Sequence, residues 1–269
     1  EVKKFEQVNP YTEVNAATEY FVKEPEDFAQ FVKYQPPVPQ ADCSRITRAR
    51  DMVGGEGVVA PWLPSIFNTL SRLRKLDDLI CDAVEDPDLF QGMMAYFRDR
   101  TMQAAAQVAR VSDIVTYEGN IANGSIAGPN FFNEFLFDDE KAVIDTIKAN
   151  GAYVLFHNCG DCNNMFEVYD RLGLDALETL TPPPFGNADV ARAIRTLKPG
   201  MTLLGNIDQI EFLIKASPEE VRERARELIA VMKPRGNFIL ATSDYLENGT
   251  PEANIRALAQ AARDFGTYA

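Results

Sequence analysis

The chain has 269 residues, of which 46% are hydrophobic and 25% are charged, as in an ordinary globular protein. That length fits one large α/β domain or two smaller ones. The 40 acidic residues exceed the 27 basic residues, which gives a formal net charge of -13. No run of Lys and Arg stands out, so nucleic acid and anionic membrane surfaces are disfavoured as partners, because both reward cationic patches.

The sequence carries no feature of a membrane or secreted protein. No apolar run approaches the roughly 20 residues that a membrane helix needs. The first residues, EVKKFEQVNPY, contain no hydrophobic signal-peptide segment and no initiator Met. The chain has too few cysteines for a disulfide framework, namely Cys43, Cys81, Cys159 and Cys162. We therefore expect a cytoplasmic protein with free thiols.

Residues 1–41 are polar and punctuated by prolines, and we expect an N-terminal extension and linker there, with a short amphipathic helix at 24–34. Residues 42–269 have regular patterning and are expected to form a single domain. A short apolar run at 57–62, between a glycine and a proline, predicts a buried strand. Helical spacing predicts the helices of this first part, at 44–54, 65–75, 77–84 and 86–111.

From residue 112 onward a strand–helix unit repeats. The expected strands are 112–120, 151–160, 175–183, 201–208 and 237–244. The expected helices are 130–149, 163–172, 188–197, 209–214, 218–233 and 251–265. With the strand at 57–62, this alternation predicts a parallel sheet, either doubly wound or closed as a (β/α)8 barrel.

The polar residues at the strand ends favour the barrel. They are Glu118, His157, Cys159, Glu178, Asn206, Asp208 and Asp244. A barrel gathers the carboxyl ends of all its strands around one site, whereas an open sheet offers a crevice only at its switch point. No glycine-rich nucleotide fingerprint follows any strand. We therefore predict a TIM-type (β/α)8 barrel whose first strands are absent from this chain.

His157 is the only histidine of the chain, and Cys159 follows it by two residues at a predicted strand end. In a strand, residues i and i+2 point to the same side, so imidazole and thiolate can share one ion. Zinc accepts nitrogen, sulfur and oxygen ligands, and Glu118, Glu178 and Asp244 are candidate oxygen donors. The alternative is a buried structural histidine beside an inert thiol.

Cys159 and Cys162 also form a CxxC pair. Dithiol chemistry would need a lowered thiol pKa, which the helix expected near Asn163 is placed to supply. No thioredoxin-like βαβ context surrounds the pair, and His157 fits a metal better. Cys162 as an additional metal ligand is a separate alternative.

Other strand-end residues have both a functional and a structural interpretation. Glu118 precedes a Gly/Asn-rich loop that is a candidate substrate lid, or it is a surface carboxylate. Asn206 is a candidate for hydrogen bonding to substrate or cofactor or for orienting a ligand, whereas Asp208 is better explained as a cap for the helix that follows. Trp62 is a candidate wall of a cofactor pocket or an ordinary rim residue.

Several segments together resemble the uroporphyrinogen decarboxylase superfamily. They are FHNCG (156–160), LGLDALETL (172–180), LLGNID (203–208), ASPEEVRERARELI (216–229) and TPEANIRALAQAARDFGTY (250–268). The resemblance covers most of residues 112–269 and implies a (β/α)8 barrel that lacks its first several dozen residues. The superfamily includes tetrapyrrole decarboxylases and zinc-dependent methyltransferases that work with corrinoid proteins.

Within this superfamily the sequence is more similar to the methyltransferases. Their His-x-Cys pair binds zinc and is matched by His157 and Cys159. They add a second cysteine on the strand matched by 237–244, where this chain has Asp244. The zinc sites of O-demethylase methyltransferases include carboxylates, so the resemblance implies a site completed by Asp244 or Glu118.

The resemblance therefore implies a zinc-dependent enzyme that moves a methyl group between a small-molecule donor or acceptor and a corrinoid (cobalamin) on a partner protein. Glu118, Asn206 and Asp244 are the catalytic candidates. One alternative is a decarboxylase of tetrapyrroles, with Arg45, Arg48 and Arg50 as the cationic cluster, although the segment ATSDYLENG lacks the histidine typical of that branch.

A second alternative is not enzymatic: a degenerate barrel that serves as a subunit of a complex. Its partner would be a homo-oligomer copy or a chain that supplies the missing N-terminal strands.

Overall fold

The computed structural model describes residues 5–7, 15–17 and 19–268. The chain divides into two compact units, which are described in turn. Unit 1 comprises residues 1–122 and 129–156, and unit 2 comprises residues 123–128 and 157–269. The expected extension at 1–41 lies partly outside the described residues. No helix within the described ranges is long and apolar enough to cross a membrane.

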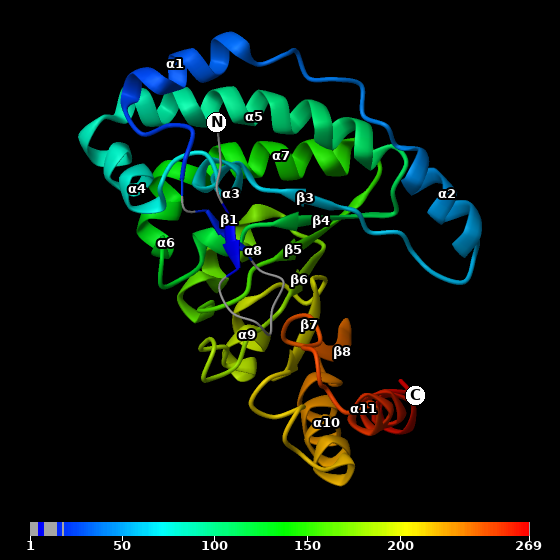
Figure 1. The fold of residues 1–269 in the computed structure, drawn as a ribbon. Helices are drawn as coiled ribbons and strands as arrows, with labels where there is room; N and C mark the ends of the chain where they lie inside the picture. The colour runs from blue at the N-terminus through cyan, green and yellow to red at the C-terminus, as the bar shows by residue number, and fades with distance from the viewer. Residues whose placement is uncertain (1–4, 8–14, 18, 269) are drawn as a thin grey trace. The chain divides into compact units, whose positions relative to one another are not determined.

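Unit 1 contains a small antiparallel strand pair and the first strands of the α/β fold (Figure 1). Its strands are β1 (Phe5–Gln7), β2 (Asn15–Ala17), β3 (Trp62–Pro64), β4 (Ile114–Glu118) and β5 (Tyr153–His157), which ends on the first residue of unit 2. Its α-helices are α1 (Pro25–Tyr34), α2 (Ser44–Val53), α3 (Ile66–Ser71), α4 (Leu76–Glu85), α5 (Pro87–Ala109), α6 (Gly128–Phe131) and α7 (Phe137–Ala149). A 3-10 helix, η1 (Asn120–Ala122), follows β4, and a π-helix, η2 (Phe132–Leu136), joins α6 to α7.

Unit 2 continues the alternation. Its strands are β6 (Ala176–Glu178), β7 (Thr202–Ile207) and β8 (Phe238–Thr242). Its helices are η3 (Asn163–Met165), α8 (Phe166–Leu172), α9 (Val190–Thr196), α10 (Pro218–Met232) and α11 (Glu252–Phe265). In the part of the chain that the structure describes, β3 to β8 are the six parallel strands of an α/β fold.

Strand order follows chain order within each unit. In unit 1 the order is β3-β4-β5, and Trp62 pairs with Thr116 in the parallel register of β3 and β4. In unit 2 the order is β6-β7-β8, with Leu177 opposite Leu203 and Asn206 opposite Ala241. Since parallel strands run the same way, the carboxyl ends of β6, β7 and β8 lie at one edge.

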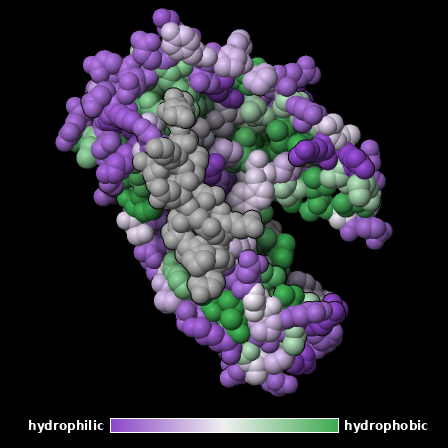
Figure 2. Space-filling view, in the orientation of Figure 1, coloured by the Kyte–Doolittle hydropathy of each residue, from purple (hydrophilic) through white to green (hydrophobic). Residues whose placement is uncertain are grey.

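Helices pack against each unit's apolar residues. In unit 1, α5 and α7 run side by side, and Phe90 of α5 and Ile144 of α7 are buried (Figure 1). In unit 2, α10 packs on α11, and Val221 of α10 is fully buried. In the same orientation, hydrophilic residues cover most of the visible surface and apolar residues form separate patches between them (Figure 2).

Local sequence signals explain where the longer helices begin. The carboxylate of Asp86 accepts a hydrogen bond from the Leu89 N–H at the start of α5, and Pro87 occupies the first turn. At α10, Ser217 and Glu220 form a reciprocal capping box before the helix, again with a proline in the first turn. Proline fits there because the first helical N–H groups have no partner within the helix.

The predicted alternation of strands and helices is confirmed, but β5 and β6 end at His157 and Glu178, before the expected 160 and 183, and two other local predictions are wrong. Residues 209–215 form turns rather than a helix. The Asp208 carboxylate accepts hydrogen bonds from the N–H groups of Ile210 and Glu211, at 2.7 and 2.9 Å, and this side-chain bonding competes with a regular helical pattern. Asp208 thus caps a turn.

The first strand of the α/β fold is also shifted, to Trp62–Pro64 from the expected 57–62. The Val59 N–H donates to the carboxylate of Asp113 at 2.9 Å, instead of to a backbone carbonyl of β4. Pro61 has no N–H to donate. The segment before Trp62 therefore touches the start of β4 without forming a strand.

Candidate metal centre

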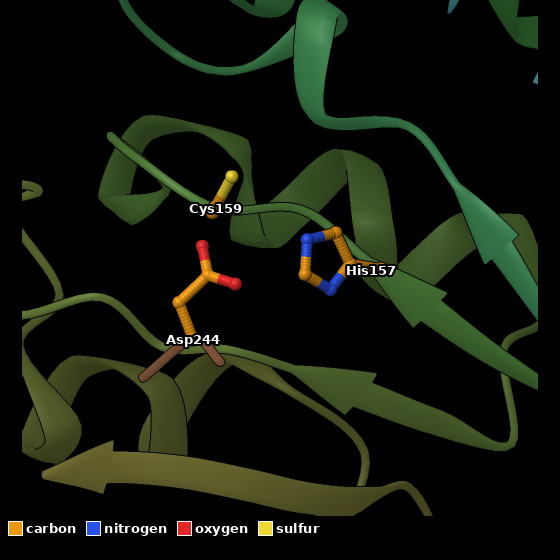
Figure 3. A group of neighbouring side chains, drawn as sticks. All are labelled: His157, Cys159 and Asp244. Carbon is orange, nitrogen blue, oxygen red and sulfur yellow. The ribbon is translucent and has the colours of Figure 1, made fainter. Parts of the chain in front are cut away.

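The structure brings His157, Cys159 and Asp244 together in unit 2 (Figure 3). One ligand atom from each side chain lies within 4.8 Å of those of the other two. His157 is the last residue of β5, Cys159 follows it by two residues, and Asp244 lies just beyond the end of β8. These three are among the four predicted metal ligands, and the fourth, Glu118, is not part of this group.

The Glu178 carboxylate fixes the orientation of the His157 ring. Glu178 is the last residue of β6, and its Oε1 lies 2.8 Å from Nδ1 of His157. The backbone also joins these segments, because the Asn158 N–H donates to the Glu178 carbonyl at 3.1 Å. With Nδ1 engaged by Glu178, Nε2 remains for an ion, and Figure 3 shows one ring nitrogen facing Cys159 and Asp244. A carboxylate behind a histidine is the usual support of a metal-bound imidazole.

His157 is 7% exposed, and its surroundings favour the protonated ring. Burial by itself lowers the pKa of His157, but hydrogen bonds with Cys159 and Glu178 outweigh burial and raise the pKa to about 10. Both partners are groups that favour a protonated imidazole beside them. A metal ion at this place would replace the proton, because metal binding requires the neutral imidazole.

The three side chains fit a zinc ion by their chemistry. They offer one imidazole nitrogen, one thiolate sulfur and one carboxylate oxygen, all of which zinc accepts. Three protein ligands leave a fourth position, as in catalytic zinc sites; structural sites usually have four protein ligands. A zinc ion held by these three side chains would have a fourth position free for a substrate or water.

The environment of Cys162 differs from that of the three clustered residues. It is 2% exposed, and burial followed by the nearby Asp161 charge raises the pKa of its thiol to about 12. A thiol with such a raised pKa is a poor nucleophile, so Cys162 is unsuited to be the attacking thiol of dithiol chemistry. Among the described residues, the clustered donors do not include Cys162.

Polar residues that sequence reasoning did not single out hold the loop that contains Cys159. The Gly160 N–H donates to the Thr181 hydroxyl at 3.2 Å. The side-chain oxygen of Asn187 accepts hydrogen bonds from the N–H groups of Cys162 and Asn163, at 2.9 and 3.0 Å. The sequence signal of such a rigid support is the run of three prolines at 182–184, shortly before Asn187.

Asn206, predicted to contact substrate or cofactor, is 2% exposed at the end of β7. Its Nδ2 donates to the Leu180 carbonyl at 3.0 Å, while its Oδ1 has no hydrogen-bond partner among the described residues. A buried acceptor of this kind is costly unless a ligand or water satisfies it. The prediction that Asn206 contacts a ligand stays a prediction.

Two further candidates, Glu118 and Trp62, lie in unit 1. Glu118 ends β4, and its Oε2 lies 3.3 Å from a guanidinium nitrogen of Arg72. Trp62 begins β3 and is 57% exposed. Their predicted roles, as metal ligand or catalytic group and as pocket wall, stay predictions.

Comparison with known proteins places the chain in a family. The family model for uroporphyrinogen decarboxylase (URO-D) matches residues 10–265. Methylcobamide:CoM methyltransferase MtbA of Methanosarcina acetivorans is 21% identical over 162 residues, which are 60% of this chain and 45% of that protein. A methylated-thiol–coenzyme M methyltransferase of Methanosarcina mazei is 22% identical over 220 residues, which are 81% of this chain and 56% of that protein.

A solved structure, a methyltransferase from Methanosarcina mazei, has the same fold. The TM-score is 0.78 at 16% identity, and the match covers 98% of this chain and 76% of that one. The chain spans about half the length of the curated relatives it matches. Because the family model matches nearly the whole chain, this chain belongs to the uroporphyrinogen decarboxylase (URO-D) family.

Proposed function

We propose that this chain belongs to a zinc-dependent methyltransferase that exchanges a methyl group with a corrinoid protein. The observation that carries the proposal is the cluster of His157, Cys159 and Asp244, whose donor atoms lie within 4.8 Å of one another. The names of the two curated relatives support the reaction type, since one transfers methyl from methylcobamide to CoM and the other from a methylated thiol.

Each residue of the site has a distinct role in this proposal. His157, Cys159 and Asp244 hold the ion, and Glu178 keeps the imidazole in one orientation and one tautomer through its contact with Nδ1. When bound, zinc supplies Lewis acidity to a thiol or ether group of the substrate. The unpartnered Oδ1 of Asn206 is a candidate acceptor for a donor group of the substrate.

The proposal includes a (β/α)8 barrel as the parent fold. The six parallel strands would be consecutive strands of that barrel, and the likeness to the Methanosarcina mazei methyltransferase supports this. In such a barrel the carboxyl ends of the strands carry the active site. His157, Glu178 and Asp244 all lie at or just beyond such ends.

The side chains of the structure support the decarboxylase alternative less well. Arg45, Arg48 and Arg50 lie on α2 and are all exposed. Arg50 is also paired with Asp113, at 3.1 Å. These residues fit a solvated helix face better than a pocket for the carboxylates of a tetrapyrrole.

The proposal is tested by measuring the metal content of the purified protein by elemental mass spectrometry, without chelators. We expect about one zinc per chain, with most of it lost in the His157→Ala and Asp244→Asn variants. Cys81→Ser is the matched control, because Cys81 is an exposed thiol on α4 in unit 1. Zinc bound equally by the wild-type protein and the His157→Ala variant would contradict the proposed site.

Activity then distinguishes the alternatives. A zinc-loaded protein should demethylate a methylated corrinoid in the presence of a thiol acceptor, and His157→Ala should abolish this reaction. Decarboxylation of uroporphyrinogen by the metal-free protein would instead support the decarboxylase alternative. A zinc-free protein without either activity would support the alternative in which the chain is a non-enzymatic subunit of a complex.

A further inference from the structure

A second ionisable group, Glu140 in unit 1, is buried and takes no part in the metal centre. Glu140 lies in the first turn of α7 and is 2% exposed. Its Oε1 accepts a hydrogen bond from the Phe67 N–H at 3.0 Å, and its Oε2 accepts one from the Ile66 N–H at 3.4 Å. The Tyr117 hydroxyl also donates to Oε2. One carboxyl group thus joins α7 to the N-terminus of α3 and to β4.

Helix α3 also contacts the segment that follows β4. The Asn68 side chain donates to Oδ1 of Asn120, and its own Oδ1 accepts a hydrogen bond from the Ile121 N–H at 3.1 Å. Asn68 is 1% exposed, so these hydrogen bonds are shielded from water. The first turn of α3 therefore lies between Glu140 on one side and η1 (Asn120–Ala122) on the other.

Burial and hydrogen bonding act in opposite directions on the pKa of Glu140. Burial raises the pKa of Glu140 to about 7, although the donors from Tyr117, Phe67 and Ile66 favour the ionised form. The neighbouring Asp139 carboxylate acts with burial, and it is itself paired with Arg98 of α5 at 2.8 Å. Helix α3 has no ionisable side chain. On β4, Tyr117 is the ionisable residue that contacts Glu140.

We propose that Glu140 is a proton-dependent latch that holds α3 and, through Asn68, the η1 segment against α7. When the carboxyl group is protonated, the closed latch buries no charge and is the favoured state. When it is ionised, opening of the segment hydrates the charge, so the open state becomes more populated. The device would make the mobility of the segment after β4 sensitive to pH near neutrality.

The direction of the pH dependence follows from the linkage between proton binding and closure of the latch. A carboxyl group whose pKa is higher in the closed state than in the open state binds more protons when closed. Its stabilisation of the closed state is therefore complete below about pH 4.5, the ordinary value, and is lost as the pH rises through about 7. The population of the open segment should thus increase from acidic to mildly alkaline pH.

Hydrogen–deuterium exchange of the full chain tests the latch. Peptides covering residues 62–73 and 117–122 should be measured at about pH 5.5 and about pH 8.5, with each rate divided by the intrinsic rate of the unprotected amide. We expect the opening equilibrium of both peptides to rise roughly 30-fold between these pH values. Peptides from the middle of α5 should show no comparable rise.

Two variants make the result specific. Glu140→Gln replaces the carboxyl with a neutral amide and should abolish the pH dependence in both peptides. Tyr117→Phe removes a donor that favours the ionised form, so the midpoint of opening should shift to higher pH. Glu134→Gln is the matched control on η2, where the side chain is exposed, and should behave like the wild type.

The expected results are a pH-dependent opening in the wild type, a flat profile in Glu140→Gln and a raised midpoint in Tyr117→Phe. An opening equilibrium of the wild type that does not change with pH would overturn the proposal. The same holds for a Glu140→Gln profile that still follows the wild type. If Glu140→Gln does not fold, the wild-type profile and the Tyr117→Phe midpoint still decide the question.

Discussion

Nδ1 of His157 and Oε1 of Glu178 lie 2.8 Å apart, so a strand-end carboxylate orients the only imidazole of the chain. Both residues are partly or largely shielded, with 9% and 21% of their side chains exposed. A hydrogen bond that is shielded in this way is weakened less by water than one at the surface. The contact therefore presents the other ring nitrogen to the neighbouring thiol and carboxylate in one preferred orientation.

The first prediction concerns this supporting carboxylate. Glu178→Gln should weaken zinc binding about 10- to 100-fold, because a neutral amide holds and polarises the imidazole less well than a carboxylate does. Zinc affinity can be measured by competition with a chromogenic chelator. Glu219→Gln is the control, since Glu219 is an exposed carboxylate on α10 of the same unit. Equal affinities of Glu178→Gln and wild type would show that Glu178 does not support the ligand.

The second prediction concerns thiol reactivity and its pH dependence. Burial raises the pKa of Cys162 to about 12, so its thiolate fraction stays very small between about pH 7 and about pH 10. Alkylation with iodoacetamide under native conditions should therefore label the exposed Cys81 and leave Cys162 unlabelled throughout this range. Peptide mass spectrometry gives the site of labelling. Rapid native labelling of Cys162 would contradict the raised pKa of its thiol.

The third prediction concerns the start of α10. Ser217→Ala removes the hydroxyl that accepts from the Glu220 N–H at 3.3 Å, and it should lower the free energy of unfolding by about 1 kcal/mol. Ser217→Asp keeps an acceptor at the same place and should retain most of the stability. Urea unfolding followed by circular dichroism gives both values. Equal losses in the two variants would mean that the cap contributes little.

The sequence by itself determined the features that depend on neighbouring residues. Alternation of apolar strands with amphipathic helices predicted the α/β fold, and capping residues such as Asp86 and Ser217 marked where helices begin. The spacing of His157 and Cys159 predicted that both donors face one ion, although β5 ends at His157 and Cys159 lies beyond the strand. These signals are local, because they arise from backbone periodicity and from hydrogen bonds within one turn.

Only the tertiary structure decided which distant residues meet. Asp244 joins His157 because β8 brings it there, and Cys162 differs from Cys159 because it is buried. Long-range contacts also overruled local patterns, as where the Asp113 carboxylate takes the Val59 N–H ahead of β3. Such contacts depend on the packing of elements far apart in the chain, which local periodicity does not encode. The same reason explains why the burial of Glu140 against α3 and β4 was not visible in the sequence.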